Sequence, residues 1–441
     1  MAQKQTELPD MEDAQPAGLA ARRAAMGMLV SILDRRQSLD DAVNHNRALK
    51  ELPANDRAFA RLLVHTVLRR LPEIDQAFQQ FLDRPLPKNP KELSQLLRTG
   101  TAQLLFLKTP PHAAVDTSVA LANEFQNKKF KGLVNAILRK VAAIKAEPDN
   151  PAKLNTPEWL WQSWVDQYGE ETATAIGLRH LADPPIDISA KEDPAFWATS
   201  LDAELLPTGT IRRTAGGRPS DWPGFEEGRW WVQDAAAALP VKLLGSVAGK
   251  SVIDLCAAPG GKTAQLVNAG ANVTAVDISR NRLSRLESNL ARLQLSANTI
   301  VADLRDWRPN ALADIVLLDA PCTATGTCRR HPDILRLRNE GDVAKLAAVQ
   351  SSLLDAAAEM VTPNGTLLYI TCSLQPEEGP DQISSFLDRH TNYQRTQFDI
   401  SADAALESII ADDGSLRTLP SHWPDQGGMD GFFAVVLTRV L

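Results

Sequence analysis

Long apolar runs are missing from this chain of 441 residues. No stretch approaches the roughly 18–20 consecutive apolar residues that a membrane-spanning helix needs, so we expect no membrane partner. The stretch Met1–Pro16 is polar and acidic, and it lacks the basic and apolar regions of a secretion signal. The sequence therefore predicts a cytoplasmic protein with a disordered tail over residues 1–18.

Cysteine is also scarce, and it falls only in the second half of the chain, at Cys256, Cys322, Cys328 and Cys372. Without a secretion signal, four thiols are not expected to form a disulfide framework. No CxxC motif and no Cys/His pair has the spacing of zinc ligands, so we expect no metal site. The thiols are therefore expected to be free and available for chemistry.

An excess of positive charge is absent as well, because the net charge is −7. This balance argues mildly against a nucleic-acid partner, although a local basic cluster can bind phosphate within an acidic protein. Two such clusters occur: Lys128, Lys129, Lys131, Arg139 and Lys140, and Arg329, Arg330, Arg336 and Arg338. Either one, taken alone, is also typical of an ordinary solvated surface.

The sequence divides into regions with different hydrophobic patterns. Residues 19–146 contain little glycine and show helical periodicity, as in the stripe Leu133, Val134, Ile137, Leu138 and Val141. Residues 155–230 combine a tryptophan-rich helix with short strand-like pieces and are interpreted as a small mixed α+β subdomain. Residues 231–441 alternate between strand-like and helical segments.

The alternation in the last region predicts a mostly parallel sheet with helices on both faces. The expected strands are Ser251–Cys256, Asn272–Ile278, Thr299–Asp303, Asp314–Asp319 and Thr366–Thr371. A helical pattern runs from Val343 to Val361, and Phe432–Val440 is expected to add an edge strand. The predicted fold is thus an all-α N-terminal domain followed by an α/β, Rossmann-like domain.

Polar residues mark a ligand site at the carboxyl ends of these strands, where open α/β sheets bind ligands. Four acidic residues fall at or near strand ends: Asp254, Asp277, Asp303 and Asp319. The first strand leads into Ala258-Pro259-Gly260-Gly261-Lys262-Thr263, which matches neither a dinucleotide fingerprint nor a P-loop. The glycine turn, and Asp277 as an acid suited to the hydroxyls of a ribose, favour a cofactor that contains a nucleoside. Because no phosphate-binding loop is present, a nucleoside such as S-adenosylmethionine is favoured over a nucleotide.

Two cysteines follow neighbouring strands of this sheet. Cys322 ends the run Asp319-Ala320-Pro321-Cys322, and Cys372 lies in Thr371-Cys372-Ser373. A thiolate that adds to carbon 6 of cytosine makes carbon 5 nucleophilic enough to accept a methyl group. An acid near N3 stabilises the charge that develops, and a base must later remove the carbon 5 proton.

These motifs have a counterpart in a known family. Asp254–Thr263, Asp319–Gly326 and Tyr369–Glu378 resemble the RNA (cytosine-5) methyltransferase family. The arrangement of the chain from about Leu19 is similar to the bacterial Fmu/Sun (RsmB) branch, which modifies 16S ribosomal RNA. The resemblance implies a NusB-like RNA-binding domain over 19–146 and an S-adenosylmethionine-dependent methyltransferase domain over 231–441.

The resemblance also implies roles for individual residues. Cys372 would be the nucleophile, Cys322 would help to release the product, and Asp319 would contact the cytosine ring. The residues expected to bind the cofactor are Cys256, Ala257, Ala258, Pro259, Gly260, Gly261, Lys262, Asp277, Asp303 and Asp319. RNA contacts are expected at Arg329, Arg330 and His331, and from the N-terminal basic cluster at Lys128, Lys129 and Lys131. The expected partner is 16S ribosomal RNA or an early small-subunit assembly intermediate, bound by a monomer.

Three other kinds of protein share parts of this pattern. DNA cytosine-5 methyltransferases use the cysteine of the Pro-Cys motif as nucleophile and carry a Glu-Asn-Val run, which is not found in this sequence. A transfer-RNA cytosine-5 methyltransferase of the same family stays open, although the helical N-terminal region argues against it. A non-catalytic RNA-binding assembly or antitermination factor would be expected to have lost the catalytic residues, which are all present.

Overall fold

The computed structural model describes residues 18–124, 128–146, 148–214, 216–398, 400 and 404–440. The chain divides between Asn155 and Thr156 into two compact units, which are described separately below. Apart from Gly18, the predicted disordered tail lies outside the described residues.

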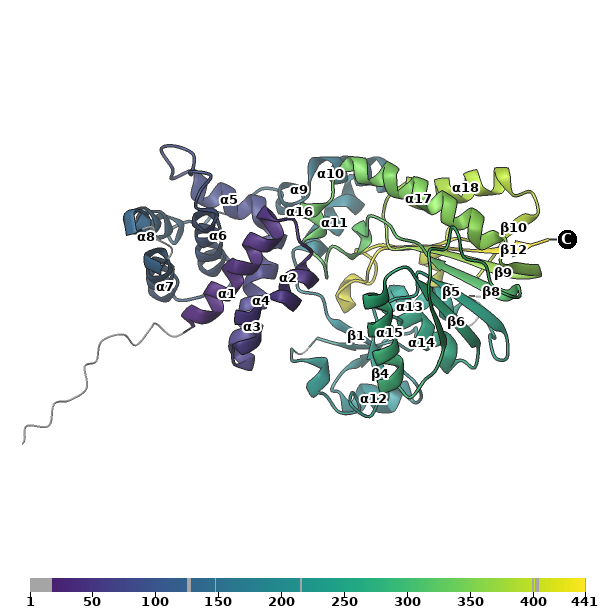
Figure 1. The fold of residues 1–441 in the computed structure, drawn as a ribbon. Helices are drawn as coiled ribbons and strands as arrows, with labels where there is room; N and C mark the ends of the chain where they lie inside the picture. Colours follow the sequence, from purple (N-terminus) through teal and green to yellow (C-terminus); the bar gives the residue numbers. More distant parts are fainter. Residues whose placement is uncertain are drawn as a thin grey trace, which may run out of the picture. The chain divides into compact units, whose positions relative to one another are not determined.

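The first unit is built from helices over its described residues, as the sequence predicts (Figure 1, purple to blue). Its helices are α1 (Leu19–Leu29), the π-helix η1 (Val30–Asp34), α2 (Leu39–His45), α3 (Arg47–Glu51), α4 (Ala54–Arg69), α5 (Leu71–Gln79), α6 (Lys91–Leu105), α7 (Pro111–Glu124), the short η2 (Lys128–Phe130), α8 (Lys131–Val141) and α9 (Pro151–Asn155).

Helix α8 illustrates why this region is helical. Val134, Ile137, Leu138 and Val141 recur at three- and four-residue spacing, and all four are buried. The charged residues of the same helix are exposed. The apolar stripe therefore supplies part of the core of the first unit, as its periodicity predicts.

The second unit begins with two helices and a small antiparallel sheet. These elements are α10 (Glu158–Tyr168), α11 (Glu170–His180), β1 (Ile186–Ala190), α12 (Pro194–Ser200), β2 (Glu204–Leu205), β3 (Ile211–Arg213), η3 (Pro219–Asp221) and β4 (Trp230–Val232). The strand order is β2-β3-β1-β4, with antiparallel neighbours throughout. This region belongs to the same compact unit as the large sheet that follows.

The large sheet has the strand order β10-β12-β9-β8-β5-β6-β7, and β11 pairs with β12 beside this path. The strands from β5 to β9 run parallel to one another, which confirms the predicted fold class. The elements are α13 (Ala235–Lys242), β5 (Ser251–Leu255), α14 (Gly261–Asn268), β6 (Asn272–Asp277), α15 (Arg280–Arg292), β7 (Asn298–Val301), β8 (Ala313–Asp319), η4 (Thr325–Thr327), α16 (Ile334–Leu337), α17 (Glu340–Ala358), β9 (Val361–Thr371), η5 (Pro376–Glu378), α18 (Pro380–Arg389), β10 (Tyr393–Thr396), η6 (Ala404–Ile409), β11 (Leu416–Thr418), η7 (Pro424–Gln426) and β12 (Phe432–Arg439).

The prediction that Phe432–Val440 forms an edge strand is wrong. β12 lies between β9 and β10 and is antiparallel to both. Its residues from Phe432 to Leu437 are buried, which fits a central position. The strand at the edge is β10, whose short polar sequence Tyr-Gln-Arg-Thr gives little signal of a strand.

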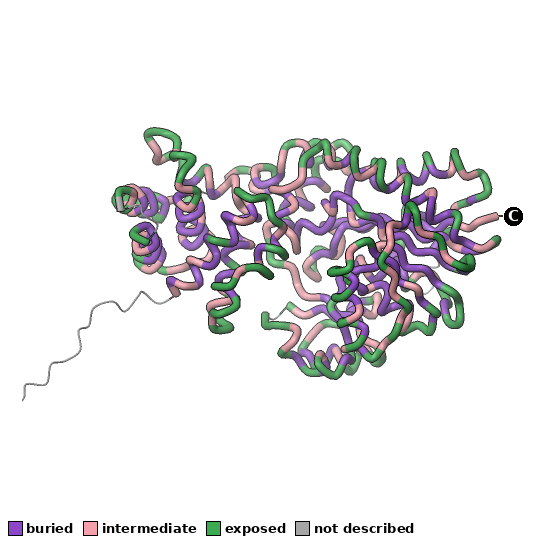
Figure 2. The backbone as a smooth tube through the Cα atoms, in the orientation of Figure 1, coloured by how far each residue is buried: buried purple, intermediate pink, exposed green. Residues whose placement is uncertain are grey.

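The central strands alternate between two hydrophobic cores, one on each face of the sheet. Ile253 and Val316 point to the core that includes Leu354 of α17, while Val252 and Leu317 point to the core with α13 and α14. Helices α17 and α18 therefore cover one face, and α13, α14 and α15 cover the other (Figure 1). Most residues of these central strands are buried (Figure 2). This packing places the carboxyl ends of all the parallel strands on the same side of the sheet, where the loops that follow them lie together.

Candidate active site

The turn after β5 requires glycine because of its conformation and its packing. Gly260 has a φ of 100° and precedes the first residue of α14. A Cβ atom at this position would lie 2.7 Å from Cγ of Leu286 on α15. Glycine alone meets both conditions without strain. Helix α14 starts directly after it at Gly261, and a helix start leaves backbone N–H groups available to a ligand.

Asp254 lies within β5 rather than after it, and it is fully buried. Its Oδ2 atom accepts a hydrogen bond from Thr263 Oγ1 at 2.6 Å. Burial raises the pKa of Asp254 to about 7. We therefore interpret Asp254 as a residue that holds α14 against the sheet.

Cys256 begins the predicted cofactor turn in a left-handed conformation, with a φ of 59°. Burial, reinforced by the negative charge of Asp319, raises the pKa of the Cys256 thiol to about 12. Such a thiol stays protonated at neutral pH, so Cys256 is not suited to act as a nucleophile. The predicted cofactor residues from Cys256 to Lys262 form one continuous run from the end of β5 into α14.

Asp277 ends β6, and its carboxylate is already engaged by the adjacent loops. Oδ2 accepts a hydrogen bond from Ala258 N at 3.2 Å, and Oδ1 accepts one from Ser279 N at 2.9 Å. Nη1 of Arg282 lies 3.6 Å from Asp277 Oδ2, and the same guanidinium donates to Ala258 O. The Asp277 side chain is only 1% exposed, whereas that of Arg282 is 53% exposed. Arg282 is therefore a charged neighbour of Asp277 that the sequence did not indicate.

Asp303 follows β7 and remains accessible, with its side chain 25% exposed. Hydrogen bonds from the side chain and backbone of Arg305 lower the pKa of Asp303 to about 2. The carboxylate is therefore ionised at neutral pH and can accept hydrogen bonds from a ligand.

Asp319 and Lys262 form an ion pair between the end of β8 and the start of α14. Lys262 Nζ lies 2.8 Å from Asp319 Oδ2, and it also lies 5.3 Å from the centre of the Phe432 ring. The Lys262 side chain is 9% exposed, and that of Asp319 is 33% exposed. Asp319 can therefore be reached by a substrate while it stays paired with Lys262.

The two cysteines predicted to share a pocket lie side by side. Cys322 Sγ and Cys372 Sγ are 3.4 Å apart. β8 and β9 are adjacent parallel strands with Asp319 opposite Ile370, so the loops that follow them start from the same edge. The hydrogen bond to Cys372, followed by burial, raises the pKa of Cys322 well above its usual value. Cys322 is therefore held as a thiol next to the half-buried Cys372.

Glycine is required a second time where three loops meet. A Cβ atom at Gly326 would lie 1.9 Å from Gly431 O. The Gly326 N–H donates to Cys372 O at 2.9 Å, and the Gly431 N–H donates to Gly326 O at 2.7 Å. Backbone contact thus joins the loop after Cys322, the end of β9 and the loop before β12.

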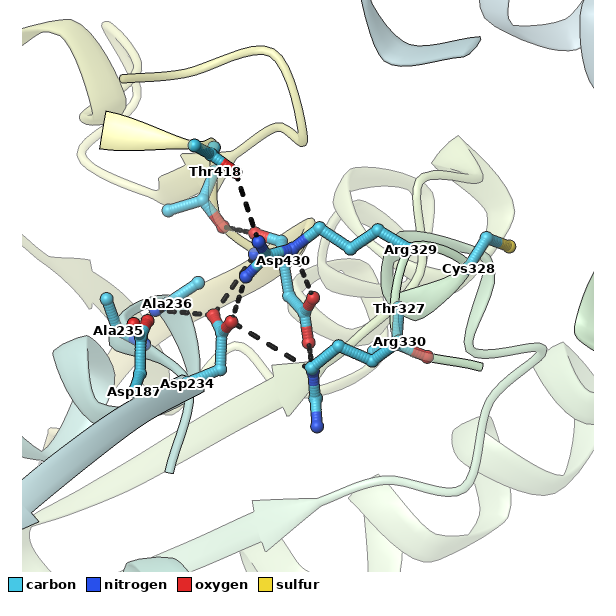
Figure 3. Close-up of polar contacts among 12 residues, drawn as sticks. Asp187, Asp234, Ala235, Ala236, Thr327, Cys328, Arg329, Arg330, Thr418 and Asp430 are labelled. Atoms are coloured by element: carbon cyan, nitrogen blue, oxygen red, sulfur yellow. Dashed lines mark hydrogen bonds and ion pairs between the residues drawn. The ribbon is translucent and has the colours of Figure 1, made fainter. Parts of the chain in front are cut away.

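The prediction that Arg329 contacts RNA is wrong. Its side chain is fully buried and donates hydrogen bonds to Asp234 and to Asp430 Oδ1, the latter at 2.9 Å. Arg329 and Arg330 converge on these two aspartates, which come from the start of α13 and from the loop before β12 (Figure 3). Buried carboxylates need opposite charge, which explains why Arg329 points inward.

The other two residues of this predicted RNA contact remain accessible. Arg330 also pairs with Asp430, but its side chain is 35% exposed. His331 is partly buried. RNA binding by Arg330 and His331 therefore stays a prediction that the geometry permits.

We expect Asp430→Ala to lower the free energy of unfolding by about 3–5 kcal/mol, because it leaves Arg329 buried with one partner fewer. Urea denaturation followed by circular dichroism would measure the loss. Asp425→Ala removes an exposed aspartate from the same loop region and should change stability by less than about 0.5 kcal/mol. A loss below about 1 kcal/mol for Asp430→Ala would contradict a structural role for the cluster.

The N-terminal basic cluster lies in the first unit. Lys129 and Lys131 are exposed, at η2 and at the start of α8, and Lys129 Nζ lies 4.9 Å from the centre of the Phe130 ring. The side chain of Lys128 lies outside the described part of the structure. Exposed lysines are also typical of a solvated helix, so RNA binding here stays a prediction.

Among the described residues, none of the helices combines the length and the apolar character needed to cross a membrane. The same part of the chain contains no group of three or more His, Cys, Asp or Glu side chains arranged to hold a metal ion.

Two family models match the chain. The model of the 16S rRNA methyltransferase RsmB/F family matches residues 241–438, and the NusB family model matches residues 19–143. The two matches fall on opposite sides of the boundary between Asn155 and Thr156.

Similar proteins cover most of the chain. A ribosomal RNA small subunit methyltransferase B of Yersinia enterocolitica is 35% identical over 391 residues, which are 84% of this chain and 90% of the Yersinia protein. A protein of the same name from Yersinia pseudotuberculosis is 34% identical over 414 residues, covering 88% of this chain and 94% of that protein.

Solved structures share the fold at low sequence identity. The crystal structure of PH0851 has a TM-score of 0.77 at 22% identity and covers 99% of this chain and 100% of that chain. The crystal structure of NSun6 from Pyrococcus horikoshii with SFG has a TM-score of 0.55 at 19% identity, covering 65% of this chain and 98% of that chain.

Proposed function

Because the chain belongs to the 16S rRNA methyltransferase RsmB/F family, we propose that it transfers a methyl group from S-adenosylmethionine to carbon 5 of a cytosine in 16S ribosomal RNA through a covalent Cys372 adduct. Methyl transfer from this cofactor to ribosomal RNA is the activity of the family. The observation that supports carbon 5 is the cysteine pair at the ends of β8 and β9, with 3.4 Å between Sγ atoms.

Cys372 is the better nucleophile of the pair. Cys322 is buried and its pKa is raised by its hydrogen bond to Cys372 and by burial, so it stays a thiol. Cys372 is only half-buried and can be approached by a substrate. Addition of the Cys372 thiolate to carbon 6 gives carbon 5 the character of an enolate.

Asp319 is assigned to the cytosine ring. Negative charge develops at N3 when the thiolate adds, and a polar group placed there stabilises it. Asp319 is accessible at the end of β8, and its charge is balanced by Lys262 at 2.8 Å. In this pair the Asp319 carboxylate can accept a hydrogen bond from the amino group of the ring, and the Lys262 ammonium can donate towards N3, while Cys372 attacks.

The residues around the β5 turn fit S-adenosylmethionine, which supplies an electrophilic methyl group when bound. The tight turn at Gly260 has no phosphate-cradle pattern, and carboxylates end or follow the next two strands. We assign the run from Cys256 to Lys262 to the methionine part, Asp277 to the ribose and Asp303 to the adenine side. The exposed Arg282 borders this region.

Cys322 is assigned to product release. After methyl transfer, a base removes the carbon 5 proton and Cys372 leaves carbon 6 as a thiolate. A thiol at Cys322, 3.4 Å away, can donate a hydrogen bond to the departing sulfur and so favour its release. Cys372 would then act in the first step, the addition to carbon 6, and Cys322 in the last step, the release of the product.

We expect Asp277→Ala to weaken S-adenosylmethionine binding by about tenfold or more, because it removes the acceptor assigned to the ribose hydroxyls. Isothermal titration calorimetry would measure the affinity. The carboxylate also accepts hydrogen bonds from Ala258 N and Ser279 N, so the melting temperature should be measured in parallel. Asp306→Ala, which removes an exposed aspartate from the loop after β7, is the control. If Asp277→Ala binds S-adenosylmethionine with unchanged affinity, the assignment of Asp277 to the ribose is rejected.

The proposed function is tested with purified protein, tritiated S-adenosylmethionine and protein-free 16S ribosomal RNA, with transfer RNA and DNA in parallel. Labelled nucleosides are separated after digestion. We expect label in 5-methylcytidine from ribosomal RNA alone. Label in another nucleoside would reject transfer to carbon 5.

Other outcomes separate the alternatives. Label in transfer RNA would retain the chemistry and assign the chain to a different substrate. If free RNA takes up no label, small-subunit assembly intermediates are tested next. Cofactor binding without transfer to either substrate would favour a non-catalytic RNA-binding factor.

A further inference from the structure

Glu378 is a buried carboxylate that accepts hydrogen bonds from the loop that carries Cys322 and from helix α17. It lies in η5, within the loop that begins at Cys372, and its side chain is fully buried. Oε1 accepts hydrogen bonds from Thr323 N at 2.9 Å and from Gln350 Nε2 at 3.0 Å, and Oε2 accepts one from Thr323 Oγ1. These donors are all neutral groups.

Hydroxyl groups join the same two loops. Ser373 Oγ lies 3.2 Å from Thr323 Oγ1 and 3.2 Å from Thr325 Oγ1. The Leu374 N–H donates to Thr325 Oγ1 at 3.0 Å. The residues just after each cysteine are therefore connected through side chains as well as through backbone.

The chain on both sides of Cys322 is fixed by this group. Thr323, which follows it, is held by Glu378 through both its N–H and its hydroxyl. Pro321, which precedes it, accepts a hydrogen bond from Gln350 Nε2 at 2.9 Å, and the same amide donates to Glu378. Cys322 thus has little freedom to move relative to Cys372.

Simple packing does not explain a carboxylate at this position. Burial of an ionisable group is costly, and an apolar side chain would fill the same space at lower cost. Buried polar groups with all partners satisfied instead specify one geometry. The geometry specified here is the 3.4 Å separation of the two sulfur atoms.

We propose that Glu378 is a positioning residue which, through Thr323, holds Cys322 against Cys372. Its importance for product release rests on the proposed function, but the geometric role does not. Glu378 lies within the motif Tyr369–Glu378, in which the mechanism otherwise uses only Cys372.

The negative charge of Glu378 also favours the protonated form of Cys322. The pKa of Cys322 is raised first by its hydrogen bond to Cys372, then by burial, and also by the negative charge of Glu378. Each of these favours the thiol form of Cys322. A thiol is the form that can donate a hydrogen bond to the sulfur of Cys372.

How closely the two thiols are held together can be tested without any methyl transfer, by oxidation with glutathione disulfide. The Cys372 thiolate displaces one glutathione thiolate and forms a mixed disulfide. Cys322 then loses its proton and displaces the second, which leaves a Cys322–Cys372 disulfide and two reduced glutathiones that take up the two protons. The equilibrium in a glutathione redox buffer, read by peptide mass spectrometry, gives the effective concentration of one thiol at the other.

Three variants separate geometry from charge. Glu378→Ala should lower the effective concentration by about tenfold or more, because Thr323 loses both of its hydrogen bonds to the carboxylate. Glu378→Gln should lower it by less than about threefold, since the amide can accept from Thr323 N and donate to Thr323 Oγ1. Glu377→Ala, an exposed neighbour, should match the wild type. If Glu378→Ala does not fold, Thr323→Val removes the hydroxyl link and should lower the value by at least about threefold.

Equal effective concentrations in the wild type and in a folded Glu378→Ala or Thr323→Val variant would overturn the proposal, whether or not the protein methylates RNA. In the methylation assay, Glu378→Ala should accumulate covalent protein–RNA adduct, and Glu378→Gln should do so much less. A fall in effective concentration without methyl transfer by the wild type would keep the positioning role and reject the proposed function.

Discussion

Replacing Cys372 with alanine is expected to abolish methyl transfer to RNA, with a loss of about a thousandfold or more. Carbon 5 of cytosine attacks a methyl donor only after a nucleophile has added to carbon 6, and Cys372 is the sulfur assigned to that addition. The covalent protein–RNA adduct should disappear together with the product. Incorporation of tritium into 5-methylcytidine and the mobility of the protein on denaturing gels measure the two effects.

Cofactor binding provides a control for the same variant. Cys372 lies after β9, whereas the residues assigned to the cofactor follow β5, β6 and β7, so calorimetry with S-adenosylmethionine should be unchanged. Cys328→Ser retains a hydrogen-bond donor to Thr325 O at a fully buried position and should keep most of the activity. Substantial transfer by Cys372→Ala would show that another group is the nucleophile.

Replacing Cys322 with alanine should instead leave the first half of the reaction intact. Cys372 can still add to carbon 6, but its departing thiolate loses the thiol that lies 3.4 Å away. We expect turnover to fall by about a hundredfold or more, with a protein–RNA adduct that survives denaturing electrophoresis. Single-turnover measurements should show methyl transfer at a rate close to that of the wild type, followed by slow release.

The contrast between the two variants is the decisive result. An adduct in Cys322→Ala and none in Cys372→Ala supports the assignment of both cysteines. The opposite pattern would make the Pro-Cys cysteine the nucleophile, as in DNA cytosine-5 methyltransferases. The double variant should form no adduct, because addition precedes release.

The fold could be predicted because its determinants are local. The stripe in α8 and the alternating strands and helices after Gly249 specify a helical unit and a parallel sheet from patterns of a few residues. The ends of parallel strands then lie at one edge of the sheet. This is why Cys322 and Cys372, separated by 50 positions in the sequence, could be expected to meet.

The parts that were missed depend on partners far apart in the sequence. Arg329 has the sequence appearance of an RNA-binding arginine, but its partner Asp430 lies 101 positions later. Glu378 resembles a surface glutamate until Thr323, 55 positions earlier, is found against it. The central position of β12 follows from pairing with β9 and β10, and strand pairing is not encoded in hydropathy.

The central position of β12 has a consequence for how the protein is made. In the growing polypeptide, β9 emerges from the ribosome before β12, and until then its outer edge has no partner. Asp430 and Gly431, which contact Arg329 and Gly326, emerge equally late. The helical unit can fold early in translation. The sheet around Cys372 is completed only after Arg439 has been synthesised, so the nascent chain should not form an RNA adduct.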